Sequence, residues 1–118
     1  MKTLKVGIAS YAEMKARSLA IANGEYKPKR GEPKVWFLSL ESFAKVLSDR
    51  NRMLLKTIAE KEPESLAELA EISGRAKSNL SRTLHTLEQY GLVQLEKGQK
   101  GKIAPRALYS EITLDMRI

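Results

Sequence analysis

The sequence contains no cysteine and a single histidine, and aromatic residues make up only 6% of it. Without thiols the chain cannot form disulfides, thiolate zinc sites, iron–sulfur clusters or a cysteine nucleophile. His85 has no partner evident in the sequence, and the segment Gly98–Gly101 lacks the full spacing of a phosphate-binding loop. We therefore expect no enzyme activity, no metal and no cofactor.

Long apolar runs are also missing. No stretch approaches the roughly 20 apolar residues that a membrane-spanning helix requires. The N-terminus lacks the uninterrupted apolar core that signal peptides carry. We expect a cytoplasmic location and no membrane partner.

Acidic residues are in the minority, since 14 Asp and Glu accompany 21 Lys and Arg and the net charge is +7. This balance favours an anionic partner, because Lys and Arg that neutralise phosphates release condensed counterions. From charge alone, a protein with a generic positive bias is an equally good interpretation. The 118 residues, 42% of them hydrophobic, predict one folded domain, alone or with a short appended subdomain.

Residues 1–34 are predicted to form an extension that precedes the main domain. Alternation over Lys2 to Ala9 predicts a half-buried strand, and Ser10 is placed to cap a helix over Tyr11 to Ala22. The apolar residues of that helix are scattered around it, so we expect it to pack against something such as another subunit. The Pro- and Gly-containing segment that follows is a loop, and its cations are candidate phosphate contacts or simply solvated: Lys27, Lys29 and Arg30.

Residues 35–108 are predicted to form the main domain, and alternation predicts a final strand over 109–118. A short strand from Val35 leads into a helix capped by Ser39. The next helix begins at Asp49 or Asn51 and ends at Pro63, and its apolar stripe is Met53, Leu54 and Ile58, with Leu55 as a further candidate. Ser65 and Glu68 match a capping box at the start of a short helix that ends at Ser73-Gly74. A longer helix then runs from Arg75 or Ala76 to Tyr90, and Gly91 stops it.

This longer helix is predicted to have one core side and one polar side. Ala76, Leu80, Leu84 and Leu87 fall together on a helical wheel, opposite hydroxyls, amides and cations. Two helices joined by a Gly-containing turn form a helix-turn-helix, whose second helix reads base edges with its N-terminal half. Arg suits guanine and Asn suits adenine, although a solvated polar face is the alternative. The candidate contacts are Arg75, Lys77, Ser78, Asn79, Ser81, Arg82 and, farthest along, His85.

A basic hairpin is predicted after Gly91. Residues 92–95 form one strand, 96–101 the turn and 102–104 the return strand. Glycines in the turn permit a tight bend and a close approach to a partner. A flexible hairpin kept soluble by its lysines is the alternative. The candidate phosphate or minor-groove contacts are Lys97, Gln99, Lys100 and Lys102.

The run from Trp36 to Ile103 resembles bacterial and archaeal winged helix-turn-helix regulators of the MarR/ArsR-like type. The residues that carry the resemblance are SLAELAEISGRAKSNLSRTLHTLEQYGLV. The resemblance implies an α+β fold, a winged helix-turn-helix with an N-terminal strand–helix extension, that binds double-stranded DNA through Lys77, Ser78, Asn79, Ser81 and Arg82 and a wing at Lys97 to Lys102. It further implies a sequence-specific transcriptional regulator, as a repressor.

The N-terminal extension and the Gly-Glu-Pro segment are similar to predicted regulators encoded beside toxin genes. That similarity implies the alternative function, an antitoxin or interaction module that binds a toxin protein and can also repress its own promoter. A homodimer is a further hypothesis, because helix-turn-helix proteins favour paired half-sites and because the apolar residues of 11–21 and 112–116 are unassigned. The chain lacks the long C-terminal dimerisation helix of MarR proteins.

Overall fold

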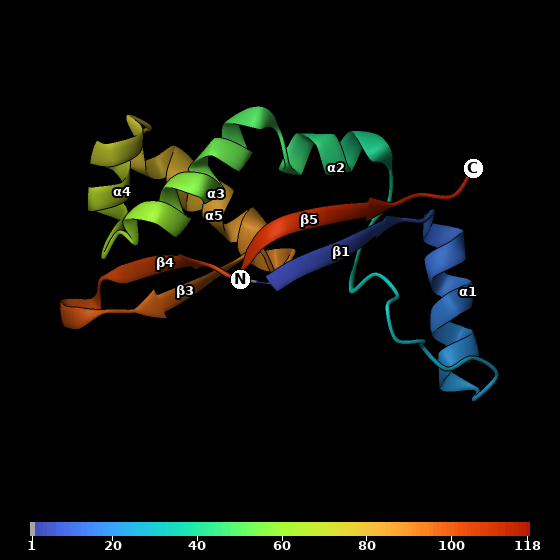
Figure 1. Cartoon of the computed structure of the whole chain (residues 1–118). Coiled ribbons are helices and arrows are strands. Elements are labelled where there is room, and N and C mark those ends of the chain that lie inside the picture. The colour runs from blue at the N-terminus through green and yellow to red at the C-terminus, as the bar shows by residue number, and fades with distance from the viewer. Residues whose placement is uncertain (1) are drawn as a thin grey trace. The chain divides into compact units, whose positions relative to one another are not determined.

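The computed structural model describes residues 2–118, apart from the side chain of Gln99 (Figure 1). Helices and strands are both abundant in this part of the chain, so the predicted α+β class is confirmed. The elements, in order, are β1 (Lys2–Ile8), α1 (Tyr11–Ala22), β2 (Val35–Phe37), α2 (Leu40–Val46), α3 (Asp49–Lys61), α4 (Leu66–Ser73), α5 (Lys77–Gln89), β3 (Val93–Lys97), a 3-10 turn (Gln99–Gly101), β4 (Ile103–Ala107) and β5 (Tyr109–Asp115).

The chain divides into two compact units. Val46–Ser110, with Lys2, forms the helix–hairpin unit. Thr3–Lys45 and Glu111–Ile118 form the strand–helix unit, which therefore combines segments from both ends of the sequence. Each unit is described by itself below.

A three-stranded sheet in the order β2-β1-β5 is the frame of the strand–helix unit. β1 and β2 are parallel, with Val6 opposite Val35 and Ile8 opposite Phe37. The arrows of β1 and β5 point the same way in Figure 1. Leu4 and Val6 are buried, as the predicted alternation of this strand requires.

Helix α1 begins with the predicted cap. Ser10 Oγ accepts a 3.2 Å hydrogen bond from the backbone N–H of Glu13, and Glu13 Oε1 accepts a 3.1 Å bond from the backbone N–H of Ser10. The Ser10 backbone N–H, and then its side chain, lower the pKa of the Glu13 carboxyl from its ordinary value. None of the residues of α1 is buried, and Tyr11 and Leu19 are 72% and 55% exposed.

Aromatic side chains pack on both sides of β2. An added Cβ on Gly7 would lie 2.6 Å from the Trp36 ring, so only glycine permits this approach. Phe37 is buried and packs edge-to-face on Phe43 of α2, with 5.3 Å between ring centroids. Ser39 and Ser42 exchange reciprocal backbone-to-hydroxyl hydrogen bonds at the start of α2, which confirms Ser39 as its cap.

Three helices and a hairpin build the helix–hairpin unit. Helix α3 contacts α4 and β4, and α5 contacts α4 and β3. Leu54 and Ile58 of α3 are buried, whereas Met53, which was predicted to lie on the same apolar stripe, is 71% exposed. The prediction for Met53 was wrong because the next position along a helix turns about 100° away, and Leu54 is the residue that faces the core. The buried apolar residues of the unit are Leu47, Leu54, Ile58, Pro63, Leu69, Leu80, Leu84, Leu87, Leu92, Val93, Ala104 and Pro105.

The predicted capping box of α4 forms only in part. Ser65 Oγ accepts a 3.1 Å hydrogen bond from the backbone N–H of Glu68. The Glu68 carboxylate accepts from the N–H of Glu64, one residue before the position a capping box requires. Gly74 ends the helix in the left-handed conformation, with φ of 73°.

The hairpin is longer than predicted. β3 and β4 pair from Val93 opposite Ala107 to Lys97 opposite Ile103, so residues 96–97 belong to a strand and the return strand continues to 107. The predicted return strand stopped before Pro105 because proline has no N–H to donate to a strand ladder. A two-stranded ladder offers edge positions at which a missing N–H costs little.

Candidate nucleic-acid interface

Helix α5 separates its residues into a core side and an exposed side. Leu80, Leu84 and Leu87 are at most 1% exposed, as predicted. Ala76 does not join them, because it lies before the first turn as an exposed N-cap. The exposed side holds Lys77, Ser78, Asn79, Ser81, Arg82 and His85, so the fold brings these predicted site residues together on one helix.

The first turn of α5 has no side-chain cap. The side chain of Ala76 offers no acceptor atom, and no acidic residue lies in that turn. Its free N–H groups and the positive end of the helix dipole therefore face solvent beside Lys77 and Ser78. This arrangement suits an anionic ligand such as a phosphate.

Arg75 does not lie on α5 but in the turn before it. Its guanidinium donates a 3.1 Å hydrogen bond to Thr83 Oγ1 and 3.4 Å bonds to Oδ1 of Asn79 and of Asn51. Its Nε is buried without a hydrogen-bond partner among the residues described. Burial, and then the nearby charge of Arg50, lower the pKa of Arg75. The side chain predicted as a DNA contact is thus engaged within the protein.

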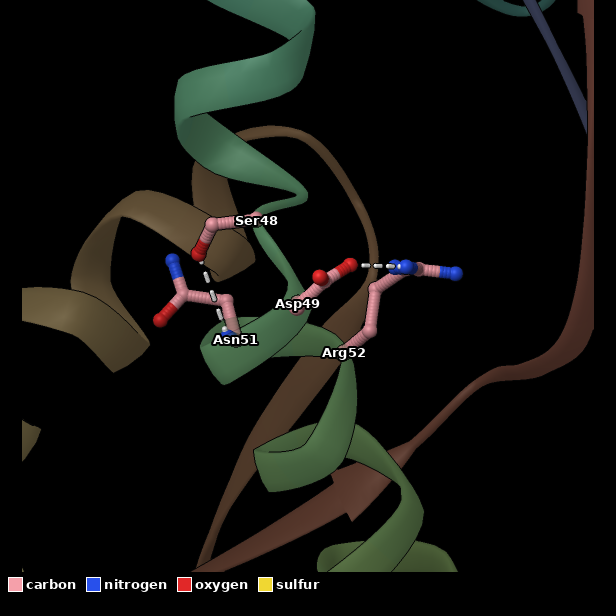
Figure 2. A network of polar contacts seen from close by, with 4 residues as sticks. All are labelled: Ser48, Asp49, Asn51 and Arg52. Carbon is pink, nitrogen blue, oxygen red and sulfur yellow. Dashed lines mark hydrogen bonds and ion pairs between the residues drawn. The ribbon is translucent and has the colours of Figure 1, made fainter.

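Asn51, the residue of α3 that accepts a hydrogen bond from Arg75, lies in the first turn of that helix. Figure 2 shows Ser48 accepting a hydrogen bond from the backbone N–H of Asn51, at 3.2 Å, and an ion pair between Asp49 and Arg52. Asn51 Nδ2 also donates to the Val46 carbonyl, at 2.9 Å. The bond to Val46 fixes the side-chain amide of Asn51, and its Oδ1 accepts from Arg75.

Arg50 is a candidate contact that the sequence did not reveal. It lies in the first turn of α3, is exposed, and is close enough to Arg75 to repel its charge. Because Arg75 hydrogen-bonds to Asn79 of α5, the charge of Arg50 adds to the positive field near the start of that helix. No local motif marks Arg50, since only the packing of α3 against the turn places it here.

The hairpin tip presents three exposed lysines, Lys97, Lys100 and Lys102. The N–H of Gly98 donates to the Lys102 carbonyl at 2.6 Å and closes the tip. Lys100 adopts a left-handed φ of 59°, which is uncommon for a residue other than glycine. The predicted contact Gln99 falls here, but its side chain lies outside the described residues.

Two further polar residues have partners within the protein. Arg106 donates 2.8 Å hydrogen bonds to the carbonyls of Pro63 and Pro105. His85 Nδ1 lies 3.9 Å from Glu88 Oε1, on the last turns of α5. His85 is 75% exposed in its side chain and remains accessible.

The predicted loop contacts Lys27, Lys29 and Arg30 are exposed and belong to the strand–helix unit. Lys29 and Arg30 line a groove of about 780 Å³ in that unit, together with α1 and the end of β5. Inside this groove Arg17 forms a 3.1 Å ion pair with Glu32 and lies 5.5 Å from the centre of the Trp36 ring. The part of the chain that the structure describes contains no acidic or histidine cluster able to hold a metal ion.

Comparison with known proteins identifies one family. No curated protein and no solved structure matches the chain significantly. Among the described residues, no helix has the length and apolar character needed to cross a membrane. The model of the HVO_A0114 family matches residues 46–114, which is more than half of the sequence, and the chain belongs to this family.

Proposed function

We propose that the helix–hairpin unit is a winged helix-turn-helix that binds double-stranded DNA, and that the protein is a sequence-specific transcriptional repressor. The observation that carries this proposal is the exposed side of α5, which gathers cations, hydroxyls and an amide opposite a leucine core. The only acid in α5 is Glu88, near its end. A helix of this kind fits the major groove with its N-terminal half toward the bases.

The order of elements supports the same proposal. Helix α4, a left-handed Gly74 and α5 are followed directly by the β3–β4 hairpin, which serves as the wing. Lys97, Lys100 and Lys102 would contact the backbone or the minor groove. Arg75 and Asn51 hold α5 against α3, so the reading face is positioned by packed elements rather than by loops.

The test is selection of bound duplexes from a random-sequence library by the full chain, followed by titrations at several salt concentrations. We expect an enriched motif and an affinity that falls steeply with salt. Arg82→Ala should reduce affinity for the motif far more than Lys15→Ala, which removes the same charge from α1 of the strand–helix unit. Absence of a motif, or equal effects of the two variants, would contradict sequence-specific reading by α5.

The alternative function, binding of a toxin protein, predicts a different result when the same full chain is tested. A protein-binding module would form a stoichiometric complex with the product of a neighbouring gene. Its salt dependence would not follow the counterion release that phosphates cause. Such a complex without any DNA motif would replace the repressor proposal.

A further inference from the structure

Strand β5 is an edge strand with an unpaired side. In the order β2-β1-β5 it pairs only with β1 among the strands described. Natural sheet edges are usually blunted by proline, lysine or a short length. The sequence of β5, YSEITLD, spans seven residues and contains neither proline nor lysine. The edge is therefore suited to pair with another strand.

Side chains of β5 alternate between two chemically different faces. Glu111 accepts a 3.2 Å hydrogen bond from Thr3, and Asp115 lies 4.0 Å from Lys5, so the odd-numbered residues share the polar face of β1. Ile112 and Leu114 alternate with them and lie on the opposite, apolar face, and Met116 follows the end of the strand in the same alternation. Leu114 and Met116 are 38% and 49% exposed.

We propose that β5 pairs antiparallel with β5 of a second copy of this chain, about a two-fold axis through Leu114. The two three-stranded sheets become one sheet of six strands, and pairing extends the strand as far as Arg117. Leu114 meets Leu114 of the partner subunit, and Ile112 meets Met116 of the partner subunit. On the polar face Glu111 lies opposite Arg117 of the partner subunit, twice in each dimer.

Charge complementarity and the extent of β5 together select this register over its neighbours. An axis at Met116 would also pair opposite charges, Asp115 with Arg117 of the partner subunit, but that axis lies past the end of β5 at Asp115. A two-fold axis perpendicular to the sheet places residues of the same face opposite each other, so the axis passes through a residue rather than between two. An axis at Thr113 would put Glu111 opposite Asp115 of the partner subunit, and an axis at Asp115 would put the two Asp115 carboxylates opposite each other. Like charges directly opposite destabilise a sheet. An axis at Ile112 forms no ion pair and places Leu114 opposite Ser110 of the partner subunit.

This interface does not depend on the proposed function. It involves only the strand–helix unit, and it predicts a dimer whether or not α5 binds DNA. Loss of DNA binding with an intact dimer would count against the repressor proposal alone. A monomer that still binds DNA would count against the interface alone.

The first test is a charge exchange measured by light scattering and sedimentation equilibrium on the full chain at tens of micromolar. Glu111→Arg and Arg117→Glu each place like charges opposite each other at two positions, so each should raise the dimer dissociation constant at least about tenfold. The double variant E111R/R117E restores both ion pairs and should return to within about threefold of the wild-type constant. A monomeric wild type, or a double variant weaker than either single one, would overturn the proposal.

The second test reads the register with cysteines, for which the chain offers a background free of native thiols. Leu114→Cys places two thiols directly opposite each other, within the roughly 4.4–6.8 Å Cα separation of disulfides. Mild oxidation should therefore give a covalent dimer. Thr113→Cys is the matched control, because its two thiols would be diagonal neighbours about 7–8 Å apart and should cross-link poorly. Preferential cross-linking at 113 would overturn the Leu114 axis.

Discussion

The guanidinium of Arg75 and the hydroxyl of Thr83 are joined by a 3.1 Å hydrogen bond that ties the turn before α5 to the middle of that helix. The same guanidinium reaches Asn51 on α3. Arg75 thus connects α3 and α5 by hydrogen bonds. Its position beside the exposed side of α5 makes it a positioning residue for the proposed DNA contact.

Replacing Arg75 should therefore destabilise the helix–hairpin unit. We expect Arg75→Ala to lower the free energy of unfolding by about 1.5–3 kcal/mol, since hydrogen bonds to charged groups contribute that much. Thr83→Val removes one acceptor and should cost about 1 kcal/mol. Denaturant unfolding followed by far-ultraviolet circular dichroism measures both. Unchanged stability in Arg75→Ala together with lost DNA binding would instead make Arg75 a direct contact.

Base reading by α5 should depend on its first turns more than on its end. Arg82→Ala should weaken binding to the selected duplex by about 1–3 kcal/mol, the range for a bidentate base contact. His85→Ala should have a smaller effect, because His85 lies one turn farther along and is 3.9 Å from Glu88. Titrations at one fixed salt concentration compare the two variants. Equal losses of affinity in the two variants would show that α5 does not approach the bases with its first turns.

We expect the hairpin to contribute to DNA affinity through its charge rather than through contacts with particular bases. Lys100→Gly removes one cation while suiting the left-handed φ of 59°, so we expect the salt-dependence exponent to fall by about 1 without a loss of stability. Lys100→Arg is the matched control and should preserve the exponent. An unchanged exponent in Lys100→Gly would remove Lys100 from the interface.

Gly74 should be required for its backbone conformation alone. An added Cβ would meet nothing within 4 Å, while φ is 73°. Gly74→Ala should therefore lower the free energy of unfolding by about 1–2 kcal/mol, the cost of a left-handed residue with a side chain. Circular dichroism of the helices provides the measurement. A loss of stability well above this range would indicate an effect of the added methyl group other than backbone strain.

Acid should weaken the cap of α1 through Glu13. Its pKa lies below the ordinary 4.5, so the folded state favours the carboxylate, and this stabilisation is present above pH 4.5 and lost as the pH falls through the lowered value. Trp36 is the single tryptophan, and its fluorescence reports the strand–helix unit. We expect the difference in Tm between wild type and Glu13→Gln to shrink below pH 4.5. A constant difference across this range would show that Glu13 stabilises the cap without its charge.

Most elements of this protein follow from local patterns. Ser10 and Ser39 cap helices through contacts only three residues long, and Gly74 ends one through its own φ, so nearby residues suffice to predict these boundaries. The core leucines of α5 follow from helical spacing for the same reason. Met53 and Ala76 departed from the prediction because a wheel gives relative directions on a helix but not which direction faces the core, nor where the first turn begins.

The sequence by itself determined the α+β class, the polar side of α5 and the basic hairpin, because periodicity, caps and turns act over a few residues. Only the tertiary structure decided that Arg75 bonds inward, that Arg50 lies beside it, and that β5 pairs with β1. These relations join residues as far as 108 positions apart, through Thr3 and Glu111, and no local pattern specifies which distant partner a charge or a strand edge will meet.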